Sequence, residues 1–476
     1  MALSDIGYKK HGEVSKDMNF QHSLPSLVLL GQLLNNIPAL VDVIIQTQGP
    51  LMTYLISCLD ASEEKIKVAA VFALLKVLGS RDQQIPIPMH GQLANRMMGL
   101  LSGADGKELQ QNSMELLRKL LENGDVVRGL MQQSRTGLPS ALKKMLMSRD
   151  TTLKVTSMQC VHHILSQDKQ DQEITHYSDD LLDADIAEFL FEALATTDGN
   201  LLSCTFGCLL LFTDCQSFFT KCHTVYGIES IIRALHHSVK LNNVEALHQG
   251  LKVLSEILKR QPEDVHLLNG LGIHKQINSL IEMCLKHSDT GIQIQTGCAL
   301  KHLLRKHHLP KPIDYIALIS LLQSMQDCME KLPRPISENT SRHHRHQRKS
   351  VKDGITDTGG ACSKEKLLLC GFDVFEQAFG LVNLLLTVPS PESHLVLMSS
   401  DKNTLTNLQY FLLRFLDSTC IPIFMVNYAD LSNPAGFASF FHMLCMAFTF
   451  NIDLKDFAQK LESLPSLLHV ILLIHS

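Results

Sequence analysis

Residues 62–78 read SEEKIKVAAVFALLKVL, and this stretch decides the fold because its pattern returns along the chain. Leu74 and Leu75 stand four and three positions before Leu78, so the three apolar side chains share one face of a helix. Five later stretches repeat this arrangement, and consecutive anchor residues are 42 to 48 positions apart. The six anchors are Leu78, Leu120, Ile164, Phe212, Ile257 and Leu303. A period of about 40–47 residues is typical of armadillo and HEAT arrays, whose units contain two or three helices.

Two further positions of the repeat support this interpretation. Seven residues before the anchor, five of the six copies carry a small or weakly polar residue, which indicates either a close helix contact or exposure to solvent. These six residues are Val71, Ser113, Ser157, Thr205, Gly250 and Thr296. A residue that can cap a helix N-terminus precedes each copy. The expected caps are Ser62, Asp105, Asp150, Asp198, Asn243 and Asp289.

Composition limits the class of protein. The chain has 476 residues, more than one compact core normally holds, so we expect several domains or one array. Its 43 basic and 48 acidic residues give a net charge of -5, so the bulk of the chain has no nucleic-acid footprint. The 13 cysteines have no disulfide-scaffold spacing and are expected to be reduced and buried. The polar N-terminus predicts no secretory signal, and we expect no membrane partner.

The pattern predicts an all-α fold, a right-handed α-solenoid of armadillo/HEAT-like repeats with a second helical block after a disordered linker. We expect a flexible N-terminal tail at residues 1–22 and the repeats at 23–332. Residues 333–364 are rich in basic residues, histidine and glycine and should form the linker, because such a composition cannot bury a core. The helical block at 365–476 ends on an apolar sequence, so we expect either a truncated chain or a partner that covers this end.

Sequence motifs for chemistry are scarce. The chain contains no phosphate-binding glycine loop, no GxSxG, no HExxH and no CxxC, so we predict no enzyme, no catalytic residue and no small-molecule substrate. The densest set of metal-ligand types lies in apolar surroundings and favours core packing over metal binding. Its members are Cys204, Cys208, Cys215, Cys222 and His223. We therefore expect no cofactor and no metal.

One local charge concentration lies in the predicted linker. Arg342, Arg345, Arg348 and Lys349 are interspersed with histidines. A solvated linker is the simpler interpretation. The alternatives are a contact with DNA, RNA or an acidic partner, or a nuclear import signal.

Several segments resemble the meiosis inhibitor protein 1 family of vertebrates. They include the quoted stretch at 62–78, GKELQQNSMELLRKLL at 106–121 and DIAEFLFEAL at 185–194. The similarity continues with FFTKCHTVYGIESIIRAL at 218–235 and GLKVLSEILKRQPED at 250–264. The string HTVYGIE is the most distinctive, because helical periodicity does not require it.

The resemblance implies a non-enzymatic scaffold for meiotic DNA double-strand-break formation, upstream of homologous recombination and chromosome synapsis. It implies a nuclear protein of germ cells whose partners are proteins of the break-formation machinery. Direct DNA contact through the linker is a further hypothesis. The alternative reading is an armadillo-type adaptor in the cytoplasm or in signalling, with no role at DNA.

Overall fold

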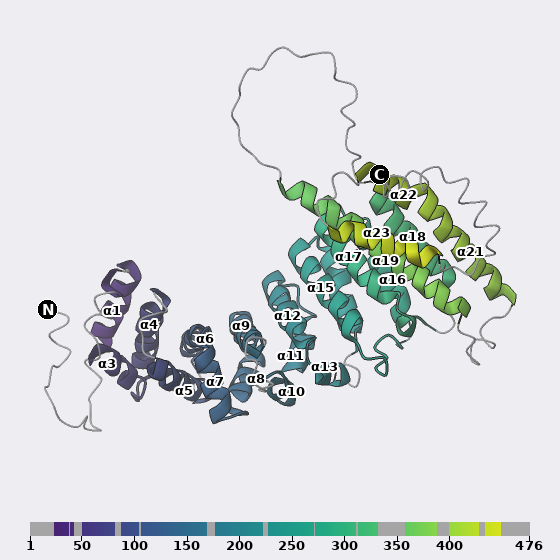
Figure 1. Cartoon of the computed structure of the whole chain (residues 1–476). Helices are drawn as coiled ribbons and strands as arrows, with labels where there is room; N and C mark the ends of the chain where they lie inside the picture. The colour runs from purple at the N-terminus through teal and green to yellow at the C-terminus, as the bar shows by residue number, and fades with distance from the viewer. Residues whose placement is uncertain are drawn as a thin grey trace, which may run out of the picture. The chain divides into compact units, whose positions relative to one another are not determined.

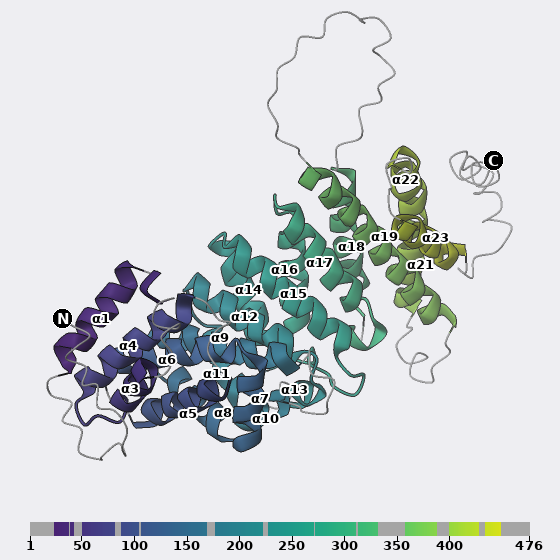
Figure 2. The ribbon, with the colours of Figure 1, turned by 60° about the vertical axis from the view of Figure 1, so that its left-hand side comes forward.

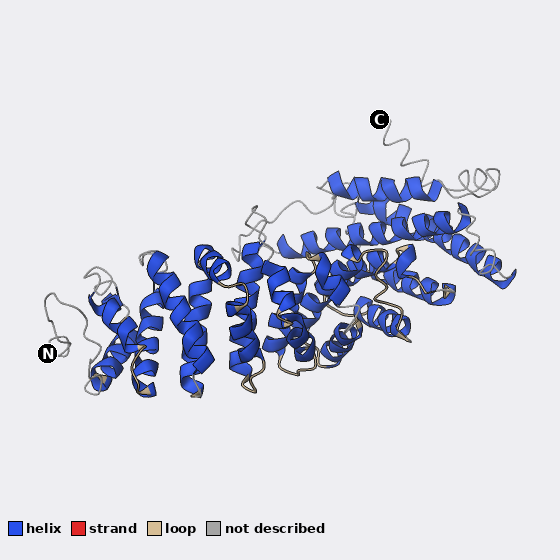
Figure 3. Ribbon diagram, turned by 90° about the horizontal axis from the view of Figure 1, so that it is seen from below, coloured by secondary structure: helices blue, strands red, loops and turns tan. Residues whose placement is uncertain are grey.

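The computed structural model describes most of the chain between residues 23 and 448. The described residues are 23–37, 39–41, 50–80, 87–103, 106–168, 177–221, 227–270, 272–310, 313–331, 358–387, 399–427 and 434–448. They divide into two compact units, an N-terminal unit up to Phe218 and a C-terminal unit from Phe219. Throughout these residues the secondary structure is helical, with no strand (Figure 3). The predicted all-α fold class, an α-solenoid of armadillo/HEAT-like repeats, is confirmed.

The N-terminal unit has two layers of helices. In one layer each helix packs against the next in chain order, and Figures 1 and 2 show these helices as a continuous row. We call this layer the long row: α1 Leu24–Asn36, α4 Glu64–Ser80, α6 Lys107–Leu121, α9 Thr151–Asp168 and α12 Gly199–Phe212. The other layer consists of α3 Pro50–Cys58, α5 Ile87–Gly103, α7 Gly124–Gln133, α8 Gly137–Leu146, α10 Tyr177–Asp183 and α11 Ile186–Ala193.

The C-terminal unit repeats this plan with two further rows. In the first row, α15 packs on α17, α17 on α19 and α19 on α23. These are α15 Val244–Arg260, α17 Thr290–Leu303, α19 Thr358–Thr387 and α23 Pro434–Phe448. In the second row, α14 packs on α16, α16 on α18 and α18 on α21. These are α14 Glu229–Lys240, α16 Ile273–Leu285, α18 Tyr315–Glu330 and α21 Ser399–Phe415. The shorter helices are α13 Gln216–Lys221 and α22 Ile421–Asn427, with a 3-10 turn at Lys306–His308 and a π-helical turn at Leu416–Cys420.

The six anchor residues lie on α4, α6, α9, α12, α15 and α17, and all six are buried. The six residues that stand seven positions before the anchors are buried as well. These positions therefore lie at close helix contacts and not at the solvent. The hydroxyl groups of Ser157, Thr205 and Thr296 donate to carbonyls of their own helix, whereas the buried Ser113 Oγ has no hydrogen-bond partner among the described residues. Ser157 Oγ donates to the Leu153 carbonyl at 2.7 Å, and Thr296 Oγ1 donates to the Ile292 carbonyl at 2.6 Å. A larger side chain at these positions would push neighbouring helices apart.

Four of the six predicted caps accept hydrogen bonds from the first turn of their helix. They are Asp150, Asp198, Asn243 and Asp289. The prediction for α6 was wrong: its N-cap is Gly106, whereas Asp105 lies outside the described residues. A Cβ at Gly106 would collide with Glu64 Oε1, so the Glu64 carboxylate lies beside the α6 N-terminus, where the helix dipole favours negative charge.

The predicted tail at 1–22 and nearly all of the linker at 333–364 lie outside the described residues. The end of the linker prediction needs correction, because α19 already begins at Thr358. Gly359 and Gly360 favour irregular structure in the sequence, but both are helical in the structure. The helix that contains them packs against its neighbours from Leu367 onward. The boundaries proposed for the remaining domains stay predictions.

One helical stretch, Ser363–Leu385 in α19, is long and apolar enough by composition to cross a membrane. Of its most apolar window, 61% is buried inside the protein. Helix α19 packs against α17 and α23, and ring contacts such as Phe372–Phe440, with centroids 5.4 Å apart, join α19 to α23. Helix α19 therefore packs as a core helix of the C-terminal unit.

Candidate partner-binding surfaces

A groove crosses three successive helices of the long row, α1, α4 and α6. It has a volume of about 840 Å3, and we call it the α1–α6 groove. Its apolar lining includes Val28, Val68 and Phe72, and its charged lining includes Lys65 and Glu108. An apolar floor with a charged rim is the pattern of a site for an amphipathic partner segment.

Two small features of the sequence shape this groove. Gly31 on α1 has no side chain, and a Cβ there would lie 2.8 Å from Phe72 Cδ1, so α1 approaches the edge of the Phe72 ring closely. Lys76 Nζ lies over the same ring, 5.0 Å from its centre, one turn along α4. The ring therefore contacts glycine backbone at its edge and a cation over its face, and it stays partly exposed.

Helix α1 carries more exposed apolar surface than a covered helix normally does. Val28, Leu29, Leu33 and Ile37 have 36–47% of their surface exposed, and Val28 also lines the groove. The opposite face of α1 is buried through Leu27, Leu30 and Leu34. Clustered exposed apolar side chains of this kind mark interaction sites more often than free surface.

The charged side chains at the C-terminal end of α6 form ion pairs with one another. Arg118 lies 2.6 Å from Glu115 and 2.9 Å from Glu122, and the pKa of its guanidinium is raised chiefly by the hydrogen bond to Glu115. Lys119 contacts Glu122 at 3.0 Å. These groups satisfy one another and leave little net charge for a partner.

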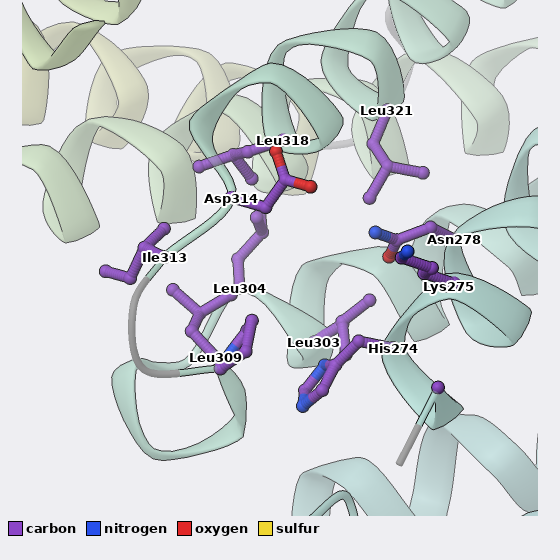
Figure 4. Close-up of a pocket in the computed structure, with 12 residues that line it drawn as sticks. His274, Lys275, Asn278, Leu303, Leu304, Leu309, Ile313, Asp314, Leu318 and Leu321 are labelled. Atoms are coloured by element: carbon purple, nitrogen blue, oxygen red, sulfur yellow. The ribbon is translucent and has the colours of Figure 1, made fainter. Parts of the chain in front are cut away.

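The C-terminal unit contains a smaller cavity between α16, the end of α17 and α18. It has a volume of about 240 Å3, and we call it the α16–α18 cavity. Figure 4 shows leucine side chains around its interior, with Lys275 and Asn278 together on one wall. Asp314, also in its lining, is the N-cap of α18 and accepts the Ala317 N–H at 3.0 Å. His274 also lines the cavity, and burial lowers the pKa of its imidazole.

Those residues singled out as metal-ligand types that the structure describes do not gather into a site. Cys208 is buried and its thiol donates to the Met158 carbonyl at 3.1 Å, whereas Cys215 contacts Asp179 at 3.2 Å. Cys222 and His223 lie outside the described residues. Within the described part of the chain, no three His, Cys, Asp or Glu side chains are placed to hold a metal ion. The basic run Arg342, Arg345, Arg348 and Lys349 also lies outside the described residues, so its role stays a prediction.

A family model described as the meiosis inhibitor protein 1 N-terminal domain matches residues 3–473. The chain belongs to the meiosis inhibitor protein 1 family. The match extends well beyond the segments that suggested the resemblance, on both sides.

Two relatives and one solved structure give the extent of the similarity. The chain is 31% identical to human meiosis inhibitor protein 1 over 473 residues and 30% identical to the mouse protein over 472 residues. Each alignment covers 95% of this chain but 36% of the relative, so the chain spans about a third of their length. A crystal structure of an engineered protein matches 91% of this chain and 96% of its own, with a TM-score of 0.57 and 14% identity, which is a likeness of fold alone.

Proposed function

We propose that the chain is a non-enzymatic scaffold required for meiotic DNA double-strand-break formation, upstream of homologous recombination and chromosome synapsis. Membership of the meiosis inhibitor protein 1 family supports a role in meiosis. The α1–α6 groove is the observation that carries the scaffold part of the proposal, because it offers apolar surface where stacked helices would otherwise present a polar face. Its proposed occupants are proteins of the break-formation machinery, and its proposed location is the nucleus of germ cells.

The groove fits one mode of recognition best. An amphipathic helix places apolar residues at positions i, i+3, i+4 and i+7 along one face, and such a face would pack on Val28, Val68 and Phe72. Lys65 and Glu108 would then set its direction through contacts with opposite charges at its two edges. A few anchors of this kind supply most of the binding energy of an interface.

Capture from meiotic tissue tests this proposal, with matched variants of the full chain. Val28→Glu places a charge on the groove, and Val244→Glu is its control, because Val244 is also exposed but lies at the start of α15. We expect the wild type and Val244→Glu to recover recombination-initiation factors, identified by mass spectrometry. Val28→Glu should recover about tenfold less, since burying a charge costs more than about 1.4 kcal/mol.

Two results would count against the proposal in different ways. Equal recovery by Val28→Glu would remove the groove from the mechanism. Recovery of only cytoskeletal or membrane proteins, with staining confined to the cytoplasm, would favour the armadillo-type adaptor instead. DNA contact through the basic run is a separate proposal, tested by gel shift of the chain with and without residues 333–363.

A further inference from the structure

Two cysteines from separate helices lie side by side in the C-terminal unit. Cys298 on α17 and Cys370 on α19 have their sulfur atoms 3.9 Å apart. Cys370 is buried, whereas Cys298 is partly exposed on the face of α17 that also carries Lys301. The proposed scaffold function uses neither thiol.

The packing of α17 on α19 holds this pair together. A Cβ at Gly297 would collide with Cys370 Sγ, so the absence of a side chain at Gly297 lets Cys370 approach the α17 backbone. Cys370 Sγ also lies 3.4 Å from the Ile294 carbonyl oxygen. Three residues further along each helix, Lys301 and Asp373 form an ion pair at 2.7 Å. The ion pair fixes the register of the two helices at the thiols.

The surroundings of Cys298 differ from those of Cys284 and Cys328 in the same unit. The hydrogen bond with Cys370 lowers the pKa of the Cys298 thiol, and the nearby Lys301 cation lowers it further. Burial instead raises the pKa of Cys284 to about 12 and that of Cys328 to about 11. The thiolate is the reactive form of cysteine, so Cys298 is the better nucleophile and Cys370 the resolving partner.

We propose that Cys298 and Cys370 form a reversible disulfide between α17 and α19 by exchange with a small disulfide such as oxidised glutathione. The Cys298 thiolate attacks one glutathione sulfur, the S–S bond of glutathione breaks, and one glutathione thiolate leaves. Cys370 gives its proton to solvent and attacks the Cys298 sulfur, which releases the second glutathione thiolate. The two cysteines are oxidised, and one glutathione disulfide is reduced to two thiols.

Formation of the disulfide requires only a small movement of the two sulfur atoms. The two sulfur atoms must approach from 3.9 Å to a bond length of about 2.05 Å. Rotation of the partly exposed Cys298 side chain supplies part of this, because it is not enclosed on all sides. The bond would join positions 72 residues apart and close a loop that contains α18 and the basic run.

Peptide mapping of the full chain tests the disulfide. The chain is equilibrated in mixtures of reduced and oxidised glutathione, remaining thiols are alkylated, and peptides are analysed without reduction. We expect a cross-linked pair of peptides containing residues 298 and 370, with loss of both alkylation adducts and their return on reduction. Cys298→Ser should abolish the cross-link and leave Cys370 alkylated.

Cys445→Ser is the matched control, because Cys445 is the exposed cysteine of α23, and the cross-link should persist in it. Two outcomes would overturn the proposal. In one, Cys298 and Cys370 stay fully alkylatable in a mixture that converts Cys445 to its glutathione adduct. In the other, Cys298 accumulates as a glutathione adduct while Cys370 remains free. Circular dichroism of Cys298→Ser shows whether the variant is folded, and the wild-type measurements decide the matter without it.

Discussion

Asp150 joins two successive helices of the long row, and its replacement tests how the repeats are coupled. Its Oδ1 accepts the backbone N–H groups of Thr152 at 2.9 Å and Leu153 at 3.2 Å, which caps α9. Its Oδ2 lies 2.7 Å from Lys107 Nζ and accepts from Gln111 Nε2 at 3.1 Å, and both partners belong to α6. One carboxylate therefore satisfies the start of α9 and links α9 to α6.

Substitutions at Asp150 separate the contribution of the α9 cap to the free energy of unfolding from that of the contacts to α6. Removing a cap costs about 1 kcal/mol. The link to α6 adds about 1 kcal/mol, because the Lys107 side chain is 72% exposed and solvent weakens its part of the link. Asp150→Ala should thus lose about 2 kcal/mol of unfolding free energy. Asp150→Asn keeps a capping oxygen and should lose about half as much. Asp198→Ala is the matched control, since Asp198 caps α12 through two N–H groups, at 2.9 and 3.0 Å.

Urea denaturation of the full chain, followed by circular dichroism, measures these differences. The hydrogen bond with Lys107 lowers the pKa of Asp150 below its unfolded value of 3.8. Its contribution is therefore present above that pH and is lost as the pH falls through the folded pKa. Equal losses for Asp150→Ala and Asp198→Ala would show that the contacts to α6 contribute nothing, and the reasoning would fail.

Three further outcomes are expected. Phe212→Ala should lower the free energy of unfolding by about 3–5 kcal/mol in the same denaturation assay, because Phe212 is fully buried and stacks on Phe218. A decrease below about 1 kcal/mol would contradict its role as an anchor. Burial lowers the pKa of His308 to about 4 from 6.5, so His308 should contribute a fall in stability of about 2 kcal/mol between about pH 7.5 and about pH 5, as the unfolded state takes up the proton. His308→Gln should remove this part of the pH dependence and leave the part from His302, whose pKa burial also lowers to about 4; an unchanged pH profile would exclude His308 as a source. If the basic run contacts DNA, replacing Arg342, Arg345, Arg348 and Lys349 with alanine should reduce the salt dependence of binding by about 0.9 per lost phosphate contact, whereas an unchanged slope in gel-shift titrations would exclude that contact.

The helical array was predictable because its information is local and repeated. The spacing of apolar residues around each anchor fixes which face of the helix is buried, and the six anchors are buried as expected. Four of the six helix caps were predictable for the same reason. At α6 the N-cap is Gly106, which lies beside Glu64 from a helix more than forty residues earlier, and the local sequence does not signal that contact.

The candidate surfaces were not predictable in this way. Phe72 belongs to the stretch that revealed the repeat, but its close contact with Gly31 joins it to a separate helix, α1, and the sequence around Phe72 does not encode that contact. The α16–α18 cavity combines two helices with the segment after α17, so no single stretch of sequence encodes it. The pairing of Cys298 with Cys370 likewise depends on how α17 meets α19.

Several helices of this chain begin with a side-chain cap of their own, and this has a consequence for how the family can vary. Asp198, Asn243 and Asp289 each bond to N–H groups two or three residues ahead of themselves, so the beginning of the helix does not depend on what precedes it. Connecting segments can therefore lengthen or shorten without disturbing the helices that follow. That freedom explains why the anchors are unevenly spaced, and it makes the connections the natural places to insert an epitope or a cleavage site.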